Sequence, residues 1–141
     1  MLWVYDDGGR QDAGYRGTAS DCTVRAIAIA TETPYKEVYD ALNGLARTHE
    51  RPRKGGKRSS SRTGVTNKTS ARYLQSLRWR WTPTMGIGTG CKVHLKDGEL
   101  PPGRLVVSVS RHLVAVVDGV IHDVYDCSRN GTRCVYGYWS R

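Results

Sequence analysis

The segment at residues 111–126, RHLVAVVDGVIHDVYD, restricts the fold of this chain more than any other stretch. Two apolar runs rich in branched side chains, Leu113 to Val117 and Val120 to Val124, flank the dipeptide Asp118-Gly119. Branched apolar residues favour β-strands, and Asp-Gly is typical of the two-residue type I′ turn, which requires positive φ at both positions. The segment therefore predicts a β-hairpin, and its turn fixes the register of the two strands.

The predicted register brings together one histidine and one carboxylate. Counting outward from the turn places Val114 opposite Asp123 and Ala115 opposite His122. Because side chains alternate between the faces of a strand, His112 shares a face with Asp123, and the two are diagonal neighbours about 7–8 Å apart. His122 falls on the opposite face. A His–carboxylate pair of this kind needs only a nucleophile to complete a catalytic triad.

The order of the remaining patterns predicts an α+β fold. Helical patterns come first and strand patterns come second, as in folds where helices pack on an antiparallel sheet. The 141 residues are enough for a single domain, spanning 1–141, with its own core. The expected helices lie at about 21–31, from Pro34 through Leu45 and at about 68–77, and the expected strands at 2–5, near 79–81, at 105–109, in the hairpin and near 134–139.

Composition indicates the setting in which the protein works. No apolar run approaches the ~18 residues of a membrane span, and the N-terminal sequence lacks the basic start and long apolar stretch of a signal peptide. We therefore expect a cytoplasmic protein without membrane contact, whose cysteines are thiols rather than disulfides. The formal net charge of +9 predicts attraction to nucleic acid or to acidic protein surfaces. The sequence leaves the oligomeric state open.

The positive charge is concentrated at residues 47–64. This segment holds seven Lys or Arg, one Glu and no large apolar side chain, so it has little to bury and is expected to form a mobile basic loop. Such a segment is most often only solvated, but it also offers contacts for nucleic acid or an acidic partner. The candidate contact residues are Arg51, Arg53, Lys54, Lys57 and Arg58.

A candidate nucleophile opens the first predicted helix. The helix is apolar on every side from Ala26 to Ala30, which is typical of a buried helix, and Cys22 lies in its first turn. The unpaired N–H groups and the dipole at a helix start favour the thiolate. Cys22 would attack a carbonyl, His112 would transfer the proton, and Asp123 would orient the imidazole. Alone, Cys22 would be read as a core residue and His112 as a polar residue at a strand end.

These residues carry two resemblances. A Cys that opens a buried helix, followed by a His–Asp pair on a later antiparallel sheet, resembles the papain-like cysteine peptidase fold, including its bacteriocin-processing branch. The stretches DCTVRAIAIAT, SRHLVAVVDGVIHD and RCVYGYW also resemble small bacteriophage-encoded proteins with no established activity. The first resemblance implies a catalytic triad of Cys22, His112 and Asp123. The second covers nearly the whole chain and implies a bacterial host cell as the place of action.

Two residues near Cys22, Arg16 and Asp21, do not fit the expected catalytic site. Papain-like peptidases usually carry a Gln about six residues before the Cys as the second oxyanion donor, whereas this chain has Arg16 there. Weak candidates for the second donor are Gln11, Thr18, Ser20 or a backbone amide. Asp21, next to the thiol, opposes the thiolate through its negative charge.

A zinc site is a weaker possibility. Cys91 and His94 have C-x-x-H spacing, and Cys127 and Cys134 follow later in the chain. The paired C-x-x-C signal of structural zinc sites is missing, so we expect neither a metal nor a cofactor.

The sequence thus predicts a thiol hydrolase that acts on a peptide or isopeptide bond of a protein or peptide substrate. The same triad also performs deamidation and acyl transfer, and the sequence does not separate these reactions. The alternative, from a different class, is a non-catalytic papain-like binding module. Such a module would engage nucleic acid or a host protein through the basic loop.

Overall fold

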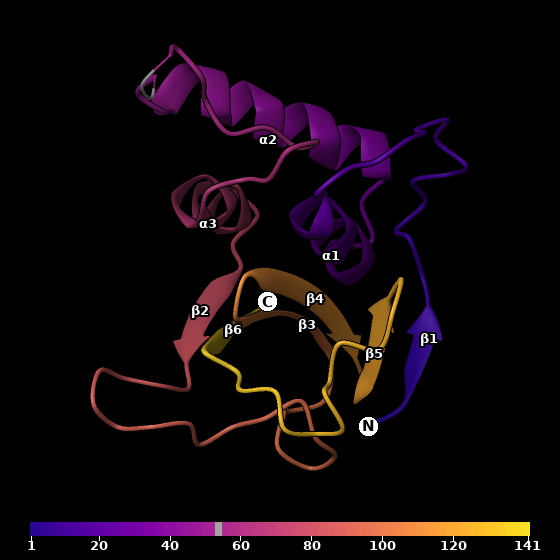
Figure 1. The fold of residues 1–141 in the computed structure, drawn as a ribbon, viewed down its shortest axis with the longest axis vertical. Helices are drawn as coiled ribbons and strands as arrows, with labels where there is room; N and C mark the ends of the chain where they lie inside the picture. Colours follow the sequence, from indigo (N-terminus) through magenta and orange to yellow (C-terminus); the bar gives the residue numbers. More distant parts are fainter. Residues whose placement is uncertain (53–54) are drawn as a thin grey trace.

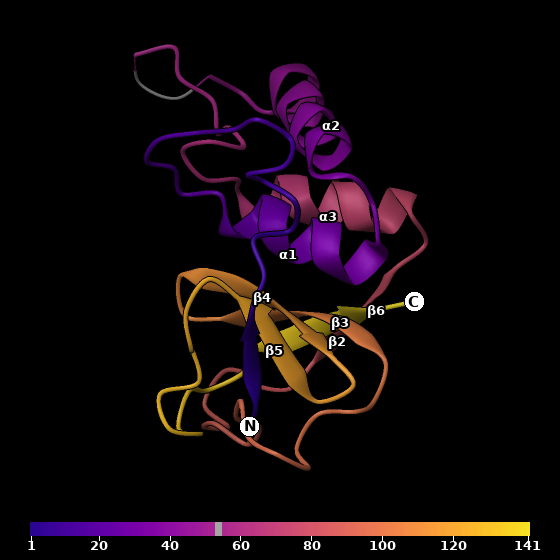
Figure 2. The same ribbon diagram turned by 90° about the vertical axis from the view of Figure 1, so that its right-hand side faces the viewer.

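The computed structural model describes residues 1–52 and 55–141. Three helices lie on one face of a six-stranded mixed sheet, as Figures 1 and 2 show, so the predicted α+β class is confirmed. The helices are α1 (Cys22–Thr31), α2 (Tyr35–His49) and α3 (Asn67–Ser76). The strands are β1 (Trp3–Tyr5), β2 (Arg80–Pro83), β3 (Arg104–Val109), β4 (His112–Val117), β5 (Val120–Asp123) and β6 (Gly137–Ser140).

The sheet has the order β1-β5-β4-β3-β6-β2. β1 pairs with β5 in parallel, and all other pairs are antiparallel. The helix α1 packs directly on β4 and β3 at the middle of this sheet, while α2 lies over α1 and α3 (Figure 2). The N-terminal half of the chain therefore meets the central strands of the C-terminal half along α1.

The central hairpin has the predicted register. Ala115 pairs with His122, and Val117 pairs with Val120. Asp118 and Gly119 form the turn with φ of 48° and 80°, the positive values that a type I′ turn requires. The local turn chemistry was therefore sufficient to fix which side chains share a face.

The core lies on both faces of the sheet. Leu113 and Ala115 point to the helical layer, where they pack with α1, and Val114 and Val116 point to a second cluster under the loops that follow β2 and β5. Ile27 at the centre of α1 is fully buried, which contributes about 1.5–3 kcal/mol relative to an exposed side chain. The apolar character of α1 on every side thus matches its buried position between the sheet and α2.

The basic segment at 47–64 differs from the predicted loop at both ends. Residues 47–49 belong to α2, and near the other end Ser61 is fully buried. Its N–H donates to Asn43 Oδ1 at 2.8 Å, and its hydroxyl donates to the Tyr39 carbonyl at 2.7 Å. Glu50 likewise accepts the N–H of Ser59 at 2.8 Å. Hydrogen bonds thus hold Ser61 against α2, although the segment has no large apolar side chain to bury.

The expectation of four thiols is wrong for one pair of cysteines. Cys91 and Cys134 form a disulfide with a Cα–Cα distance of 5.9 Å, while Cys22 and Cys127 are free. A single β-bridge between His94 and Cys134 brings the two distant segments together, which no sequence spacing indicated. In the described residues, 1–52 and 55–141, no helix combines the length and the apolar character that crossing a membrane requires.

Candidate active site

The candidate nucleophile is the first residue of α1. Cys22 is partly exposed, and the residues that follow it in the helix are almost all buried. Backbone N–H groups in the first turn of a helix have no partner within the helix and carry a partial positive charge. The thiol therefore lies where a negative sulfur is favoured, on a helix that the core holds in place.

The predicted His–Asp pair is present. His112 Nε2–H donates to Asp123 Oδ2 at 2.6 Å, and the carboxylate is only 3% exposed. The other oxygen, Oδ1, accepts the N–H of Val124 at 2.7 Å and lies 3.6 Å from Nη2 of Arg25. Because both carboxylate oxygens are engaged, the orientation of the imidazole is fixed.

His122, the residue that the register placed on the opposite face, has a different partner. Its Nδ1 lies 3.0 Å from Oδ2 of Asp6, just after β1. The two histidines of the hairpin thus contact two different carboxylates. This separation makes His122 a suitable control for experiments on His112.

The thiol and the imidazole meet at the start of β4. Burial raises the pKa of Cys22, but hydrogen bonds to His112 and from the Leu113 N–H, with the positive charges of His112 and Arg25, lower this pKa overall below its ordinary value. Nε2 of His112 is bonded to Asp123, and the thiols of Cys127 and Cys22 are the other hydrogen-bond neighbours of the imidazole. The chain therefore brings together all three residues of the predicted triad.

The imidazole is held in its charged form. Burial lowers the pKa of His112, but hydrogen bonds to Asp123, Cys127 and Cys22 outweigh burial and raise the pKa to about 11. Burial raises the pKa of Asp123, and the hydrogen bond and charge of His112 bring this pKa below its ordinary value. These directions favour a thiolate–imidazolium pair at neutral pH, the form in which a cysteine attacks a carbonyl.

A buried network beside the thiol was missed in the sequence. Asp21, 2% exposed, forms ion pairs with Arg25 on the next turn of α1 and with Nε of Arg10 at 3.3 Å. Its Oδ2 also accepts the hydroxyl of Tyr35 at 2.6 Å. Two guanidinium groups thus offset the negative charge that we expected to oppose the thiolate at Cys22. The spacing Asp21–Arg25, four residues on a helix, was the only signal available.

The weak candidates for the second oxyanion donor stay predictions. Thr18 and Ser20 are exposed, and among the described residues neither side chain, nor that of Gln11, makes a hydrogen bond, so all three are free to donate to a ligand. Gln11 lines an open hollow of about 670 Å³ together with Arg16 and Arg25. The backbone N–H of Cys22 is the donor that the helix start itself provides.

A second free thiol lies beside the His–Asp pair. Cys127, in the loop after β5, is 1% exposed and is a hydrogen-bond neighbour of His112. The zinc site considered in the sequence is excluded because Cys91 and Cys134 are bonded to each other, and His94 Nδ1 lies 3.2 Å from Glu99. The hydrogen-bond contact of Cys127 with His112 is not indicated by any spacing in the sequence.

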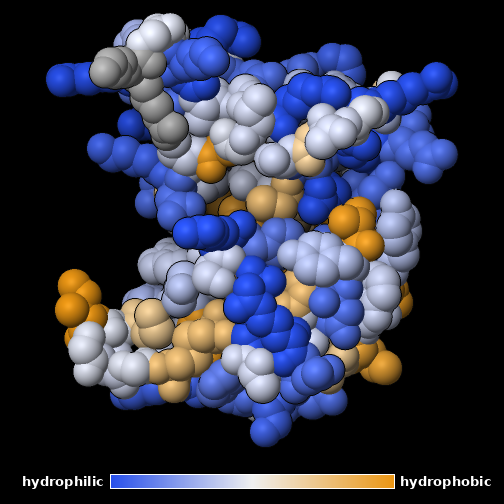
Figure 3. All heavy atoms as spheres, viewed as in Figure 1, coloured by the Kyte–Doolittle hydropathy of each residue, from blue (hydrophilic) through white to orange (hydrophobic). Residues whose placement is uncertain are grey.

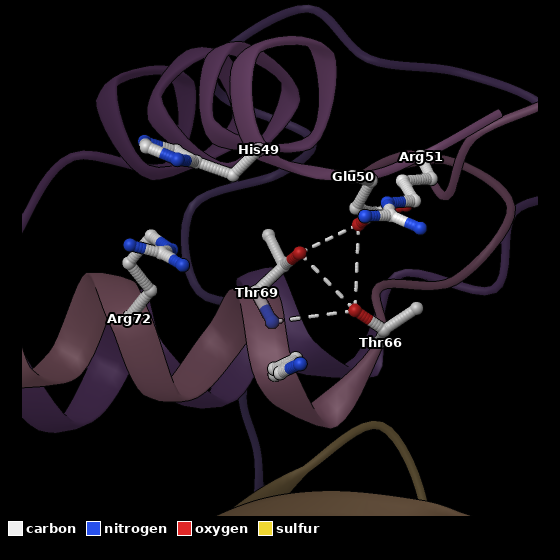
Figure 4. A pocket seen from close by; sticks show the side chains of 7 residues that line it. His49, Glu50, Arg51, Thr66, Thr69 and Arg72 are labelled. Atoms are coloured by element: carbon white, nitrogen blue, oxygen red, sulfur yellow. Dashed lines mark hydrogen bonds between the residues drawn. The ribbon is translucent and has the colours of Figure 1, made fainter.

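The candidate nucleic-acid contacts lie at the other end of the helical layer. Arg51, Lys57 and Arg58 are exposed, whereas Arg53 and Lys54 lie outside the described residues. Figure 3 shows that hydrophilic side chains predominate over the helices on this face. A hollow of about 390 Å³ lies between the end of α2 and α3, as Figure 4 shows in close-up. Its lining residues are His49, Glu50, Arg51, Thr66, Lys68, Thr69 and Arg72.

Comparisons with protein-family models, with curated proteins and with solved structures give no significant match to this chain. The resemblance to papain-like peptidases therefore remains an expectation from the sequence. What this protein does has to be argued from the geometry of its own site.

Proposed function

We propose that this chain is a papain-like thiol hydrolase that cleaves a peptide or isopeptide bond. The observation that carries the proposal is the meeting of Cys22, at the start of a buried helix, with a histidine fixed at 2.6 Å from a buried carboxylate. A core histidine needs one hydrogen-bond partner, whereas His112 has a carboxylate, the partly exposed thiol of Cys22 and the buried thiol of Cys127. This combination is the arrangement that activates a nucleophile.

In the proposed reaction, the Cys22 thiolate attacks the carbonyl carbon, and the backbone N–H of Cys22 stabilises the oxyanion. The C–N bond breaks as the His112 imidazolium gives its proton to the leaving amine. His112, now neutral, takes a proton from water, which attacks the acyl-enzyme and releases the thiolate. Asp123 keeps the imidazole oriented and stabilises its positive charge. With ammonia as the leaving group the same steps give deamidation, and with an amine in place of water they give acyl transfer.

A protein or peptide substrate and a host-cell cytoplasm remain part of this proposal. The Cys91–Cys134 disulfide weighs against the location, because disulfides are rare in proteins of a reducing cytosol.

The acid partner gives the first test. Asp123→Ala is expected to slow alkylation of Cys22 by iodoacetamide at neutral pH by about tenfold or more, the equivalent of one unit of thiol pKa. The rate is measured by mass spectrometry of the Cys22 peptide without reductant. Cys91 and Cys134 then stay bonded, and Cys127 is buried.

The matched control is Asp126→Ala. Asp126 is exposed, and its carboxylate accepts the N–H and hydroxyl of Ser128 rather than contacting His112. This variant is expected to keep the parent alkylation rate. Equal slowing by both substitutions, or by neither, would contradict the assignment of Asp123 to the triad.

The hollow at the end of α2 supports the second candidate, a binding module for nucleic acid. Arg51, Lys68 and Arg72 are exposed, and none has an ion-pair partner among the residues that the structure describes. In Figure 4, His49 and Arg72 lie on one side of Thr69 and Arg51 on the other. Cationic side chains that surround a hollow in this way suit the phosphates of a single strand.

Glu50 is the one acidic residue among the described residues that line this hollow. Its carboxylate accepts hydrogen bonds from Ser59, Thr66 and Thr69, as Figure 4 shows for the two threonines. Burial raises the pKa of Glu50, but these hydrogen bonds lower it below its ordinary value. The charge of Glu50 is thus engaged by donors of the protein itself, which leaves the surrounding cations for an anionic ligand.

Replacing Arg51 and Arg72 together by Ala is expected to weaken binding of a single-stranded DNA oligonucleotide. The slope of log affinity against log salt should become shallower by about 0.7 for each lost phosphate contact. Fluorescence anisotropy at several salt concentrations measures both quantities. The control, Arg80→Ala with Arg141→Ala, removes the same charge from exposed positions on another part of the surface. Equal losses in the two variants would show that only net charge matters.

A further inference from the structure

The imidazole of His112 has a neighbour that the proposed reaction does not use. Cys127 is a buried free thiol, and its Sγ, a carboxylate oxygen of Asp123 and a ring nitrogen of His112 all lie within 4.8 Å of one another. Cys127 and Asp123 are 1% and 3% exposed. One nitrogen, one oxygen and one sulfur thus converge in a buried place, where Cys127 also packs against the second apolar cluster.

This set of donors suits a particular class of ion. Zinc binds imidazole, carboxylate and thiolate ligands at about 2.0–2.3 Å, whereas calcium and magnesium prefer oxygen alone. Ligand atoms around a tetrahedral zinc are separated by roughly 3.5 Å. The sulfur of Cys127 and the carboxylate oxygen of Asp123 lie within 4.8 Å of each other, so a shift of about 1 Å brings them to this separation. The 2.6 Å contact of His112 with Asp123 would have to lengthen by about 1 Å when the ion binds.

The surroundings also hold the ligands in place. The Asp123 oxygen that does not face His112 accepts the Val124 N–H at 2.7 Å and lies 3.6 Å from Arg25. Such contacts behind a ligand fix its orientation in metal sites. Arg25 also places a positive charge near the ion, and the proton on His112 has to leave before the nitrogen can bind. Both effects make the site weaker than a structural zinc site.

We propose that His112, Asp123 and Cys127 bind a zinc ion, and that this metal-bound state is an off-state of the site. Zinc and the catalytic pair need the same atoms, a His112 nitrogen and the Asp123 carboxylate, so the two states exclude each other. The metal site itself stands on the ligand geometry alone. Its inhibitory role rests on the proposed hydrolase function.

The test uses Co²⁺ as a spectroscopic substitute for Zn²⁺. Purified, chelator-treated protein is titrated with CoCl₂, and a thiolate-to-cobalt charge-transfer band with saturation at one equivalent is expected. The matched pair of variants is Cys127→Ala and Cys22→Ala: the band should disappear in the first and persist in the second. A band that disappears only in Cys22→Ala, or no band in the parent protein, would overturn the proposal.

A second variant protects this test against a folding failure. If Cys127→Ala does not fold, Cys127→Ser keeps nearly the same volume and leaves no sulfur to give the band.

The inhibitory role is tested separately: ZnCl₂ is added to metal-free protein while alkylation of Cys22 is followed. One equivalent should slow alkylation at least tenfold in the parent and leave the Cys127 variant unchanged; equal slowing in both would overturn the inhibitory role.

These measurements separate the two proposals. Slow alkylation of Cys22 in the metal-free parent, with a cobalt band that requires Cys127, would refute the hydrolase and support the metal site. Fast alkylation without a cobalt band would refute the metal site and support the hydrolase.

Discussion

His112→Ala is expected to move the pH profile of Cys22 alkylation towards higher pH and to slow the reaction at neutral pH by more than tenfold. In the parent protein, hydrogen bonding and positive charge from His112 lower the pKa of the thiol, so the thiolate persists as the pH falls below ~8.5. Without His112, burial remains and raises this pKa. The measurement is the alkylation rate of the Cys22 peptide against pH, with a chelator present so that the site is free of metal.

His122→Ala is the control for this experiment. His122 contacts Asp6 and not Asp123, so its loss should leave the profile of Cys22 unchanged. Circular dichroism of both variants checks that the fold is kept. A Cys22 that is inert at every accessible pH, or that is indifferent to His112, would end the catalytic proposal and leave the binding module as the leading candidate.

Asp21→Ala is expected to lower the free energy of unfolding by about 3 kcal/mol. The substitution removes the partner of Arg10 and Arg25, whose side chains are mostly buried, and the acceptor of the Tyr35 hydroxyl. Removing one member of a buried ion network is costly because Arg10 then stays mostly buried without a described carboxylate partner, and Arg25 keeps only Asp123 at 3.6 Å. Urea unfolding followed by circular dichroism measures the change.

Two further variants show whether the cost arises from burial of charge. Asp21→Asn keeps an acceptor for Tyr35 and should cost less than Asp21→Ala. Asp40→Ala breaks an exposed ion pair with Lys36 and should have little effect, because water screens such pairs. A cost for Asp40→Ala equal to that for Asp21→Ala would contradict this explanation.

The parts of the site that could be predicted from sequence are those that local chemistry determines. Asp118-Gly119 favours one type of tight turn, and this turn alone places His112 and Asp123 on one face. Cys22 is recognisable because a helix that is apolar on every side from Ala26 to Ala30 has to lie in the core, and its first residue has to lie at the edge of that core. Both arguments use periodicity over short distances.

The features that were missed depend on contacts between distant segments. Nothing near Cys127 in the sequence indicates His112, and nothing near Cys91 indicates Cys134. The contacts of Glu50 are equally invisible in the sequence, since its partners Ser59 and Thr69 lie at spacings that match neither a helix nor a strand. Polar contacts of this kind satisfy individual atoms rather than a repeating pattern, so only the folded chain reveals them.

The disulfide covalently secures one part of the candidate active site and leaves the other part outside the closed ring. Cys91 and Cys134 close a covalent ring that contains β3, β4 and β5, and therefore both His112 and Asp123, whereas Cys22 lies outside it. A protease that nicks one of the connections inside this ring releases no fragment, because the two pieces stay joined through sulfur. Closing a ring across 43 positions also removes unfolded-state entropy worth on the order of 4 kcal/mol. The part of the candidate site that holds His112 and Asp123 is thus secured by a covalent bond, and the part that holds Cys22 only by packing, ion pairs and hydrogen bonds.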